Sequence, residues 1–386
     1  MIDDERSPLT VSLLDVVSFQ AIGKEWNQLL ETSPANTFFL TWEWMFTWWQ
    51  VYGHDYQLFL LKIQDEEGKP VGLAPLKITC HYRLGLPYRQ IEFIGYSPVL
   101  APDYLDFIFA LGYEGQGILA VWSYLMDHKN LWDILYLCDI PSGSQSPSSL
   151  SLLAEKGHYV KEIKEGHPCP YLPIVTSWEA YLKSLSQNHR YNLQRKEKRL
   201  VKSYPFTFKE ICVRSDLQEA LEELFILHKK VWNARGELGS FHRHPLNKTF
   251  HRHLVNRLSD LERVVIYTLQ IDGKSVALLY AYVYDNRLFY YQAGRETNWD
   301  EYGVGQVLMK FVLQSVFKKG IREFDFLRGA EPYKYHWTKL EHTNIHLRVW
   351  NSTIRGNILC FLTRIAYWGR HLLSPLRRMI KTKWWS

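Results

Sequence analysis

The same order of predicted elements occurs twice along this chain, and that repeat restricts the fold more than any single motif does. In the second half, "VVIYTLQIDGKSVALLYAYVYDNRLFYYQAG" predicts three strands joined by tight turns, at residues 264–271, 275–284 and 287–294. A Gly-x-Gly helix start at Gly303 and a strand near Glu323 follow. The first half repeats this order, with its own Gly-x-Gly start 188 residues earlier. The repeat predicts two similar α/β units.

The length of 386 residues also favours two domains, because one hydrophobic core ordinarily serves a shorter chain. We place the first domain at residues 1–170, the second at 171–350, and a basic amphipathic helical tail at 351–386. The Ser- and Pro-rich stretch Pro141 to Leu150 is expected to be an exposed loop or the edge of the connection between the domains.

Composition narrows the functional classes. A hydrophobic fraction of 46% and a charged fraction of 22% are typical of a soluble globular protein. The net charge of +6 allows anionic partners such as nucleotides, phosphates or lipid headgroups, and does not indicate DNA binding. The start "MIDDERSPLT" is not that of a signal peptide, and "FFLTWEWMFTWWQVYG" is shorter than the ~20 residues of a membrane span. We therefore expect a cytoplasmic protein in which this apolar segment is a buried helix.

Metal and disulfide chemistry are not expected. The five cysteines are scattered and form no Cys-x-x-Cys pair. In "HRHPLNKTFHRH", His251 and His253 would project about 200° apart on a helix, so they do not share one ion easily. His228 falls on the apolar face of another predicted helix, as a core histidine would.

The stretch "EFDFLRGAEPYKYHW" begins as a half-buried strand and then becomes polar. The end of a strand that is followed by titratable side chains is where α/β proteins often place their chemistry. Four such residues come in quick succession after Leu327: Arg328, Glu331, Tyr333 and Lys334.

A strand meander, a Gly-x-Gly helix start and a further strand are the order of the GNAT acyltransferase core. Over nearly its whole length the chain resembles FemAB-like tandem GNAT proteins, in particular the CelD-type acetyltransferases of cellulose or exopolysaccharide biosynthesis. The stretches that carry this resemblance are "FFLTWEWMFTWWQVYG", "NHRYNLQRKEKRL", "LHKKVWNARGELGSF", "FYYQAG" and "FDFLRGAEPYKYHW".

The resemblance implies two tandem GNAT folds, each a mixed and mostly antiparallel sheet flanked by helices. It also implies acyl transfer to an amine or hydroxyl, with acyl-CoA as co-substrate and no permanently bound cofactor. We expect Gly303 and Gly305 to hold the donor phosphates, because free N–H groups and the helix dipole at a helix N-terminus attract anions. The backbone from Gln292 to Gly294 would polarise the acyl carbonyl. The first domain lacks a polar strand end and would be the degenerate copy.

In such a fold the polar loop faces the acceptor. Glu331 is then the candidate base for the acceptor and Tyr333 the candidate acid for the leaving group, with Arg328 and Lys334 around the transferred acyl group. Further substrate-binding candidates are Arg190, Arg195, Arg235 and Trp337.

The nature of the donor stays open at this point. Asp300 stands where GNAT enzymes that use CoA usually have Gln or Arg, and an acid is unfavourable beside a diphosphate. FemAB relatives take aminoacyl groups from tRNA, which gives a second hypothesis. A third is a non-catalytic scaffold of an envelope-polysaccharide complex. The acceptor would be a small molecule or a glycan.

Two basic segments each have two interpretations. The helix predicted for "NHRYNLQRKEKRL" is either a solvated face or one side of an anionic groove. No acidic residue occurs from His342 to Ser386, so residues 352–386 either lie on an anionic membrane surface, at the inner face of the membrane, or pack as a helix on their own domain.

Overall fold

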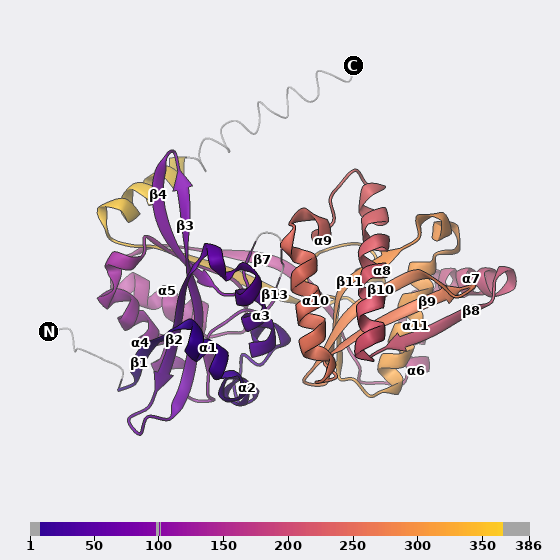
Figure 1. The fold of residues 1–386 in the computed structure, drawn as a ribbon, viewed down its shortest axis with the longest axis horizontal. Coiled ribbons are helices and arrows are strands. Elements are labelled where there is room, and N and C mark those ends of the chain that lie inside the picture. Colours follow the sequence, from indigo (N-terminus) through magenta and orange to yellow (C-terminus); the bar gives the residue numbers. More distant parts are fainter. Residues whose placement is uncertain (1–7, 98–99, 101, 366–386) are drawn as a thin grey trace, which may run out of the picture.

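The computed structural model describes residues 8–97, 100 and 102–365. Its strands form one continuous sheet that runs through both halves of the molecule, in the order β1-β2-β3-β4-β6-β13-β7-β12-β11-β10-β9-β8, with β5 paired to β3 (Figure 1). The strands are β1 (Thr10–Leu14), β2 (Gln57–Gln64), β3 (Pro70–Arg83), β4 (Leu86–Phe93), β5 (Ile108–Phe109), β6 (Ile134–Pro141), β7 (Val160–Pro173), β8 (Phe206–Ile211), β9 (Val264–Ile271), β10 (Lys274–Tyr284), β11 (Arg287–Arg295), β12 (Glu323–Asp325) and β13 (Leu340–Trp350).

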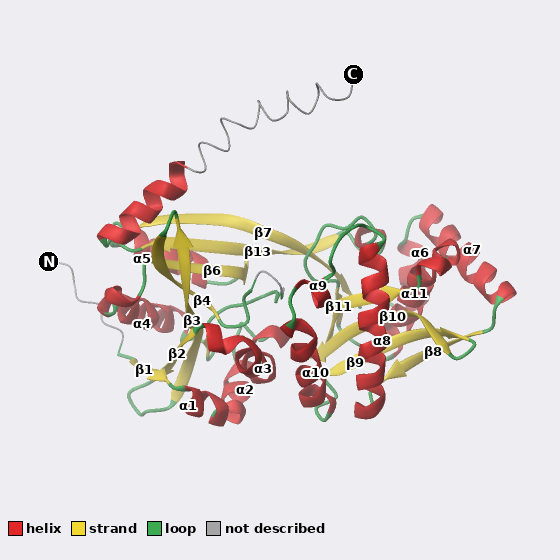
Figure 2. Ribbon diagram, turned by 45° about the horizontal axis from the view of Figure 1, so that its top comes forward, coloured by secondary structure: helices red, strands yellow, loops and turns green. Residues whose placement is uncertain are grey.

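Helices cover both faces of this sheet (Figure 2). They are α1 (Val16–Ala21), α2 (Gly23–Glu31), α3 (Trp42–Tyr52), α4 (Glu114–Asp127), α5 (Ser146–Lys156), α6 (Trp178–Ser184), α7 (Gln187–Ser203), α8 (Arg214–Asn233), α9 (Ser240–Arg243), α10 (Leu246–Ser259) and α11 (Val304–Lys318). Short 3₁₀ turns occur at η1 (Phe38–Leu40), η2 (Gly53–Asp55), η3 (Lys129–Leu131), η4 (Thr297–Tyr302) and η5 (Lys334–His336).

The predicted repeat is confirmed at the level of topology. In the first half β2, β3 and β4 form an antiparallel meander, α4 follows, and β6 pairs in parallel with β4. In the second half β9, β10 and β11 form the same meander, α11 follows, and β12 pairs in parallel with β11. This mixed α/β architecture, mostly antiparallel, is the fold class that the sequence predicts.

The last strand of each half pairs with the other half. β7 follows α5 in the chain but lies against β12, and β13 follows β12 but pairs with β6; β7 and β13 also pair with each other. The proposed domain boundary at residue 170 therefore falls within β7, and the division of the chain at residues 1–170 and 171–350 stays a prediction.

The apolar segment before residue 53 is the buried helix that the sequence predicts. α3 begins at an N-cap where the Thr41 side chain accepts from the backbone N–H of Trp44. Trp44, Phe38 and Phe39 are fully buried, and their rings contact aromatic side chains of the second half, as in the stacking of Phe38 on Tyr282 at 4.1 Å between centroids. Full burial of an apolar side chain contributes about 1.5–3 kcal/mol, so this segment is a main source of cohesion between the halves.

The sheet of the second half separates two cores. Alternate residues of β10 point to opposite faces, so that Leu278 and Tyr280 pack with α8 and α10 whereas Ala277 and Leu279 pack with α7 and α11. The first core continues into the first half of the chain, and the second belongs to residues 172–337. The helices beside the second core are therefore the ones that face away from the first half.

The predictions for the stretch Pro141 to Leu150 and for the C-terminal tail had different outcomes. The stretch Pro141 to Leu150 is not all exposed loop: α5 begins at Ser146 with Pro147 in its first turn, and Leu150 is fully buried. Of the predicted tail, residues 354–365 are helical, and residues 366–386 lie outside the described part of the chain.

Candidate active site

The candidate site lies where β11 and β12 separate. Their parallel pairing covers three residues of each strand and ends at Phe289 and Asp325. Beyond that point β11 continues to Arg295, whereas the backbone N–H of Phe326 bonds to the carbonyl of Pro170. The last six residues of β11 thus have no parallel partner, and a gap opens next to them.

The backbone of β11 is irregular along this gap. Tyr280 of β10 pairs with Gln292 and Ala281 pairs with Tyr290, so Tyr291 is the extra residue of a β-bulge. A bulge leaves the backbone groups of the extra residue out of the ladder and often occurs beside active sites. This irregularity is the local feature that could present an N–H group to an acyl carbonyl.

Two residues expected here face α8 instead of the gap. The Gln292 Oε1 atom lies 3.2 Å from Nε2 of His228, which is buried on α8. A Cβ atom on Gly294 would lie 2.6 Å from the backbone N of His228, so glycine is needed for close packing of β11 on α8. The contacts of Gln292 and Gly294 with α8 are therefore structural. Only the backbone of these two residues is left for the expected role of polarising the acyl carbonyl.

A polar pocket of about 410 Å³ lies between the start of α7 and the first turn of α11. Its lining is rich in amide and basic side chains: Ser186, Asn188, His189, Asn192, Arg195, Lys196, Gln306 and His336. The first N–H groups of a helix lack intrahelical acceptors, although that of Gln306 already donates to the carbonyl of Gly303 at 2.9 Å. An anion between the pocket and the start of α11 would meet both N–H donors and positive charge. Of the expected residues, Arg195 lines this pocket, and Gly303 lies next to its lining residue Lys196.

Lys196 links α7 to α11. Its Nζ atom donates to Gln306 Oε1 at 2.8 Å, and its aliphatic stem covers Gly303. Gly303 has φ 64°, in the left-handed region, so it both ends η4 and lets the lysine stem approach closely. A Cβ on Gly305 would meet only the Cδ atom of Arg295, at 3.5 Å, so that position is open.

The negative charge of Asp300, which is unfavourable beside a diphosphate, is compensated by Arg295. Asp300 forms two bonds with Arg295, from Nε to Oδ1 at 2.6 Å and from Nη2 to Oδ2 at 3.1 Å. A bidentate guanidinium–carboxylate pair of this kind compensates the carboxylate charge. Asp300 is therefore less unfavourable to a phosphate at α11 than its sequence position indicates.

His189 gives the pocket an unpartnered buried group. Its ring stacks on His336 at 5.2 Å between centroids and meets Trp337 edge-on at 4.7 Å. Its Nε2 atom is buried and makes no hydrogen bond with the described residues. Burial, with smaller contributions from His336 and Lys196, lowers the pKa of His189 to about 4, so the ring is neutral at pH 7.

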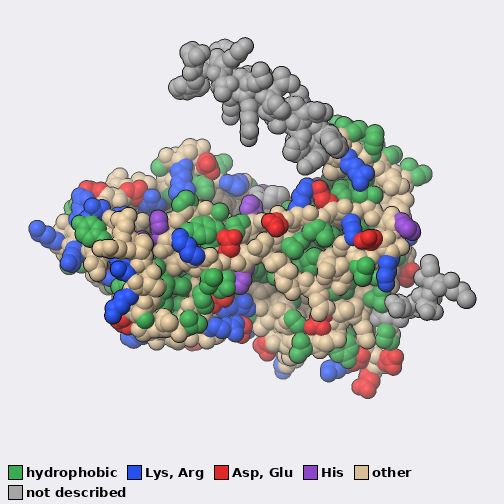
Figure 3. Space-filling model, turned by 180° about the vertical axis from the view of Figure 1, so that it is seen from behind, with side chains coloured by type: hydrophobic (Ala, Val, Ile, Leu, Met, Phe, Trp, Pro, Cys, Tyr) green, Lys and Arg blue, Asp and Glu red, His purple; other side chains and the backbone are tan. Residues whose placement is uncertain are grey.

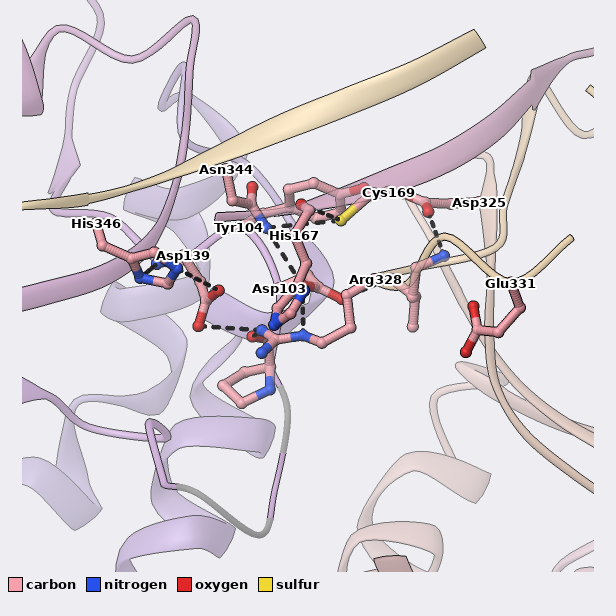
Figure 4. Close-up of polar contacts among 12 residues, drawn as sticks. Asp103, Tyr104, Asp139, His167, Cys169, Asp325, Arg328, Glu331, Asn344 and His346 are labelled. Carbon is pink, nitrogen blue, oxygen red and sulfur yellow. Dashed lines mark hydrogen bonds and ion pairs between the residues drawn. The ribbon is translucent and has the colours of Figure 1, made fainter. Parts of the chain in front are cut away.

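The polar loop after β12 is fastened to the first half (Figure 4). The Arg328 side chain donates from Nε to Asp103 Oδ1 at 2.8 Å and forms an ion pair from Nη2 to Asp139 Oδ2 at 3.0 Å. The backbone N–H of Arg328 also donates to Asp103, at 3.0 Å. Arg328 is thus oriented toward the first half, and its expected contact with an acyl group is not what this geometry favours.

Lys334 fastens the loop internally. Its buried Nζ atom donates to the carbonyls of Leu327 at 3.0 Å and Arg328 at 2.7 Å, and it lies 3.0 Å from Glu331 Oε2. Because these bonds use the three donors of an ammonium group, Lys334 shapes the loop and does not face a substrate.

Glu331 and Tyr333 lie at the gap itself. Glu331 is exposed, and Figure 4 shows it apart from the buried network around Arg328. Tyr333 is 39% exposed, and its hydroxyl hydrogen-bonds with that of Tyr290 on β11. Desolvation and this neighbour raise the pKa of Tyr333 well above its ordinary value, while the nearby Arg235 opposes the rise. The pair of phenols is therefore protonated at neutral pH and able to donate a proton.

Two further candidates have structural positions. Trp337 is buried in the core beside α11, and its carbonyl accepts from the Tyr181 hydroxyl at 2.7 Å. Arg190 donates to the carbonyls of Lys183 and Leu185 and so caps the end of α6.

His189, Lys196, Gln306 and Tyr290 are site residues that sequence reasoning did not select. The spacing of Asn188, Asn192, Arg195 and Lys196 places them on one side of a helix, and this is a signal that could have identified these four polar residues of the pocket together. No comparable signal marks Tyr290, because its partner Tyr333 belongs to a different element.

Two general features of the described residues bear on the chemistry. Among them, no cluster of three or more His, Cys, Asp or Glu side chains has the geometry of a metal site. Within the same part of the chain, no helix combines the length and the apolar content of a membrane span.

Comparison with known proteins agrees with this geometry. Residues 187–335 match the family model described as an acetyltransferase (GNAT) domain, whereas no curated protein sequence matches the chain. FemX superposes with a TM-score of 0.59 at 11% identity, covering 89% of this chain and 98% of that one. The C-terminal domain of a protein described as a lysylphosphatidylglycerol synthetase, from Agrobacterium fabrum, superposes with a TM-score of 0.50 at 12% identity, covering 90% and 96%.

A conserved protein of unknown function from Bacteroides thetaiotaomicron has the same TM-score of 0.50 at 10% identity, covering 89% of this chain and 99% of that one. Identities this low show a common fold. Residues 187–335 are thus a GNAT acetyltransferase domain, and the chain has the fold of FemX over most of its length.

Proposed function

We propose that this acyltransferase takes its acyl group from acyl-CoA, acetyl-CoA being the simplest case, and passes it to an amine or hydroxyl of a small molecule or glycan in polysaccharide or cell-envelope biosynthesis. The observation that carries the proposal is the basic pocket at the first turn of α11, which adjoins the gap between β11 and β12. A phosphate-bearing carrier in the pocket would direct its acyl end into that gap.

The donor phosphates would be held by groups that are already in place. Lys196 and Arg195 supply positive charge, the first turn of α11 supplies N–H donors, and the neutral His189 ring offers an unpartnered nitrogen. The pair of Arg295 and Asp300 borders this site without leaving a free negative charge.

In the transfer step the acceptor nitrogen or oxygen forms a bond to the acyl carbonyl carbon. Glu331 takes the acceptor's proton, directly or through a water molecule. The bulge at Tyr291 supplies backbone N–H groups to the carbonyl oxygen as it gains charge. The bond to the leaving sulfur or oxygen then breaks, and Tyr333 returns a proton to it, while the hydrogen bond with Tyr290 orients the Tyr333 ring. No cysteine lies in this part of the loop, so a direct transfer suffices.

A second donor is favoured by a specific observation. The fold of FemX covers 89% of the chain. The FemAB-like proteins that the sequence resembles take aminoacyl groups from tRNA. The same pocket would then receive the phosphates near the end of the tRNA. The third hypothesis, a scaffold without catalysis, requires that neither carrier binds.

We also propose that the enzyme works on the cytoplasmic side of the membrane, with residues 352–386 toward an anionic lipid surface. What supports this location is the sequence, since no acid occurs after Glu341.

Isothermal titration of the full chain with acetyl-CoA, a long-chain acyl-CoA and a charged tRNA tests the donor. Replacing Lys196 by Ala removes a charged hydrogen bond, and we expect about 10- to 100-fold weaker binding of the true donor. Lys198→Ala is the matched control, because Lys198 is exposed on the same helix and does not line the pocket. Equal affinity of the wild type and Lys196→Ala for every donor that binds would place the donor elsewhere, and no binding of any donor would favour the scaffold.

A further inference from the structure

The β3–β4 hairpin carries large apolar side chains into solvent at its tip. Tyr82 is 77% exposed and Leu84 is 83% exposed, and Leu86 beside them is also exposed. Leu84 and Gly85 have φ values of 50° and 80°, the two left-handed residues of a type I′ turn. That turn favours Asn, Asp or Gly, so a leucine there costs conformational energy and gains no packing in return. An exposed, strained apolar residue of this kind indicates a function outside the fold.

The helix at residues 354–365 has two apolar faces. Leu359 and Cys360 are buried against the end of β13 and β4. The other face is an exposed stripe composed of Ile354, Ile358, Phe361 and Ile365. At 100° per residue this stripe spans about 60° and points almost directly away from the buried face. The stripe is therefore not a by-product of packing.

The hairpin tip and this helix touch each other. The Arg83 guanidinium donates to Thr363 Oγ1 at 2.9 Å and to the carbonyl of Leu362 at 3.1 Å. Figures 1 and 2 both show the two elements side by side at one end of the molecule, and Figure 3 shows hydrophobic and basic side chains together beside the point where the grey C-terminal trace begins. Residues almost 280 positions apart in the sequence thus form one protruding surface, which we call the hairpin–helix surface.

The charges of this surface have one sign. No acidic residue occurs between Glu67 and Glu92, and none occurs after Glu341. Arg355 and Arg364 flank the exposed stripe of the helix, on opposite sides of it, and Arg83 lies at the contact with the hairpin. Among the described residues, the buried Asp133 lies 3.8 Å from Arg355, and Glu162, which is itself paired with Arg348, acts on Cys360 of the same helix. Apolar side chains bordered by arginines without exposed acids are what an anionic lipid surface binds.

We propose that the hairpin–helix surface docks on an anionic bilayer, with Leu84, Tyr82 and the stripe of the helix among the lipid headgroups and the arginines on the lipid phosphates. The hairpin is thus a second membrane element, distant in sequence from the tail. This inference does not depend on the acyl donor, because α7 and its pocket lie at the opposite end of the long axis of the molecule (Figure 1). Docking would leave the pocket accessible from water.

Vesicle sedimentation with the full chain tests the proposal, using vesicles of equal parts phosphatidylglycerol and phosphatidylcholine. The double variants Tyr82→Ser with Leu84→Ser, and Ile358→Ser with Phe361→Ser, should each lower the ratio of bound to free protein about tenfold or more. All four side chains are exposed, so the fold should be unaffected. Leu111→Ser and Val175→Ser are matched controls, since these apolar residues are equally exposed elsewhere and should change nothing. Pure phosphatidylcholine vesicles should bind weakly.

Wild-type binding by the hairpin variant would overturn the proposal and leave the tail as the membrane element. A loss of self-association in sedimentation velocity, with vesicle binding unchanged, would overturn it in favour of a contact between two copies of the chain. Donor titration of the same variants should match the wild type, so that failure of this proposal is distinguishable from failure of the proposed acyl transfer.

Discussion

The helices α4 and α11 occupy equivalent places in the two halves. They differ in the charge of their first turns and in the packing of Gly117 and Gly305, although Gly115 of α4 is as open as Gly305. At α4 the side chain of Phe109 fills the space beside Gly117, so that a Cβ there would overlap its ring. Glu114 adds an acid to that first turn. At α11 the first turn has no acid, Gly305 is open, and the cations of α7 face it.

The comparison shows how a duplicated fold divides its work. The first half keeps the strand order but packs Phe109 against Gly117, the fourth residue of α4, and it supplies Asp103 and Asp139 to the loop of the second half. The second half keeps the N-terminus open and carries the polar loop. The first half thus supports the loop of the half that matches a GNAT domain.

The largest expected effect is on turnover. Glu331→Gln and Tyr333→Phe should each lower kcat by about 10²–10⁴-fold, because each removes a proton transfer while leaving the fold and donor affinity nearly unchanged. Single-turnover kinetics with the donor identified by titration measures this. If both variants keep full turnover, the loop after β12 is not catalytic, and the two halves do not differ in function at this place.

The support from the first half is tested by Asp103→Ala. Asp103 is fully buried and accepts two bonds from Arg328, so its removal leaves a buried guanidinium only partly paired. We expect a loss of about 3–5 kcal/mol in the free energy of unfolding, measured by urea denaturation. Asp127→Ala is the control, since Asp127 lies at the end of α4, away from this network. A loss below about 1 kcal/mol would mean that the loop does not rely on the first half.

Two glycines near the starts of α11 and α4 test the comparison. Gly305→Val should crowd the open first turn of α11 and weaken donor binding about tenfold, with little change in stability. Gly117→Val should force apart Phe109 and α4, costing about 1–3 kcal/mol of stability with donor affinity intact. Titration and thermal melts of the two variants must therefore give opposite results. If both variants change donor affinity and stability in the same way, the starts of α4 and α11 do not differ in donor binding.

The smallest expected effect is the pH dependence of stability. Burial raises the pKa of Asp325 to about 7, although the Tyr104 hydroxyl donates to it at 2.7 Å. A folded-state pKa above the unfolded value of about 3.9 means that the folded protein binds the proton more tightly. The tighter proton binding by Asp325 stabilises the folded protein fully below pH about 4, and this stabilisation is lost as the pH rises to about 7.

Asp325→Asn should remove the loss of stability that Asp325 causes as the pH rises. Thermal melts between pH 4 and 8 measure this as a difference in melting temperature between the variant and the wild type. A difference that does not change with pH would show that Asp325 does not titrate in this range.

Much of the fold was accessible from the sequence because its signals are local. Strand alternation and the turn pairs at Asp272 and Asp285 identified the meander, and the apolar stripe identified α11. The exchange of β7 and β13 between the halves has no local signal, since it depends on pairing between residues far apart.

The candidate site was accessible only in part for the same reason. The polar residues of the loop predict a site, but no local signal indicates that Arg328 faces Asp103, more than two hundred positions earlier. On α7 the basic residues were evident, yet only packing against α11 shows that Lys196 lines the pocket whereas Arg190 caps α6. The hairpin tip was missed because exposure of Leu84 is a tertiary property.

The central claim is that the donor binds at α11 and not at α4, and hydrogen exchange measured by mass spectrometry tests it most directly. With a donor that binds by titration, the account predicts slower exchange in residues 188–196 and 303–307 and unchanged exchange in residues 113–118. Protection at the start of α4, or no protection at α11 under saturating donor, would contradict it.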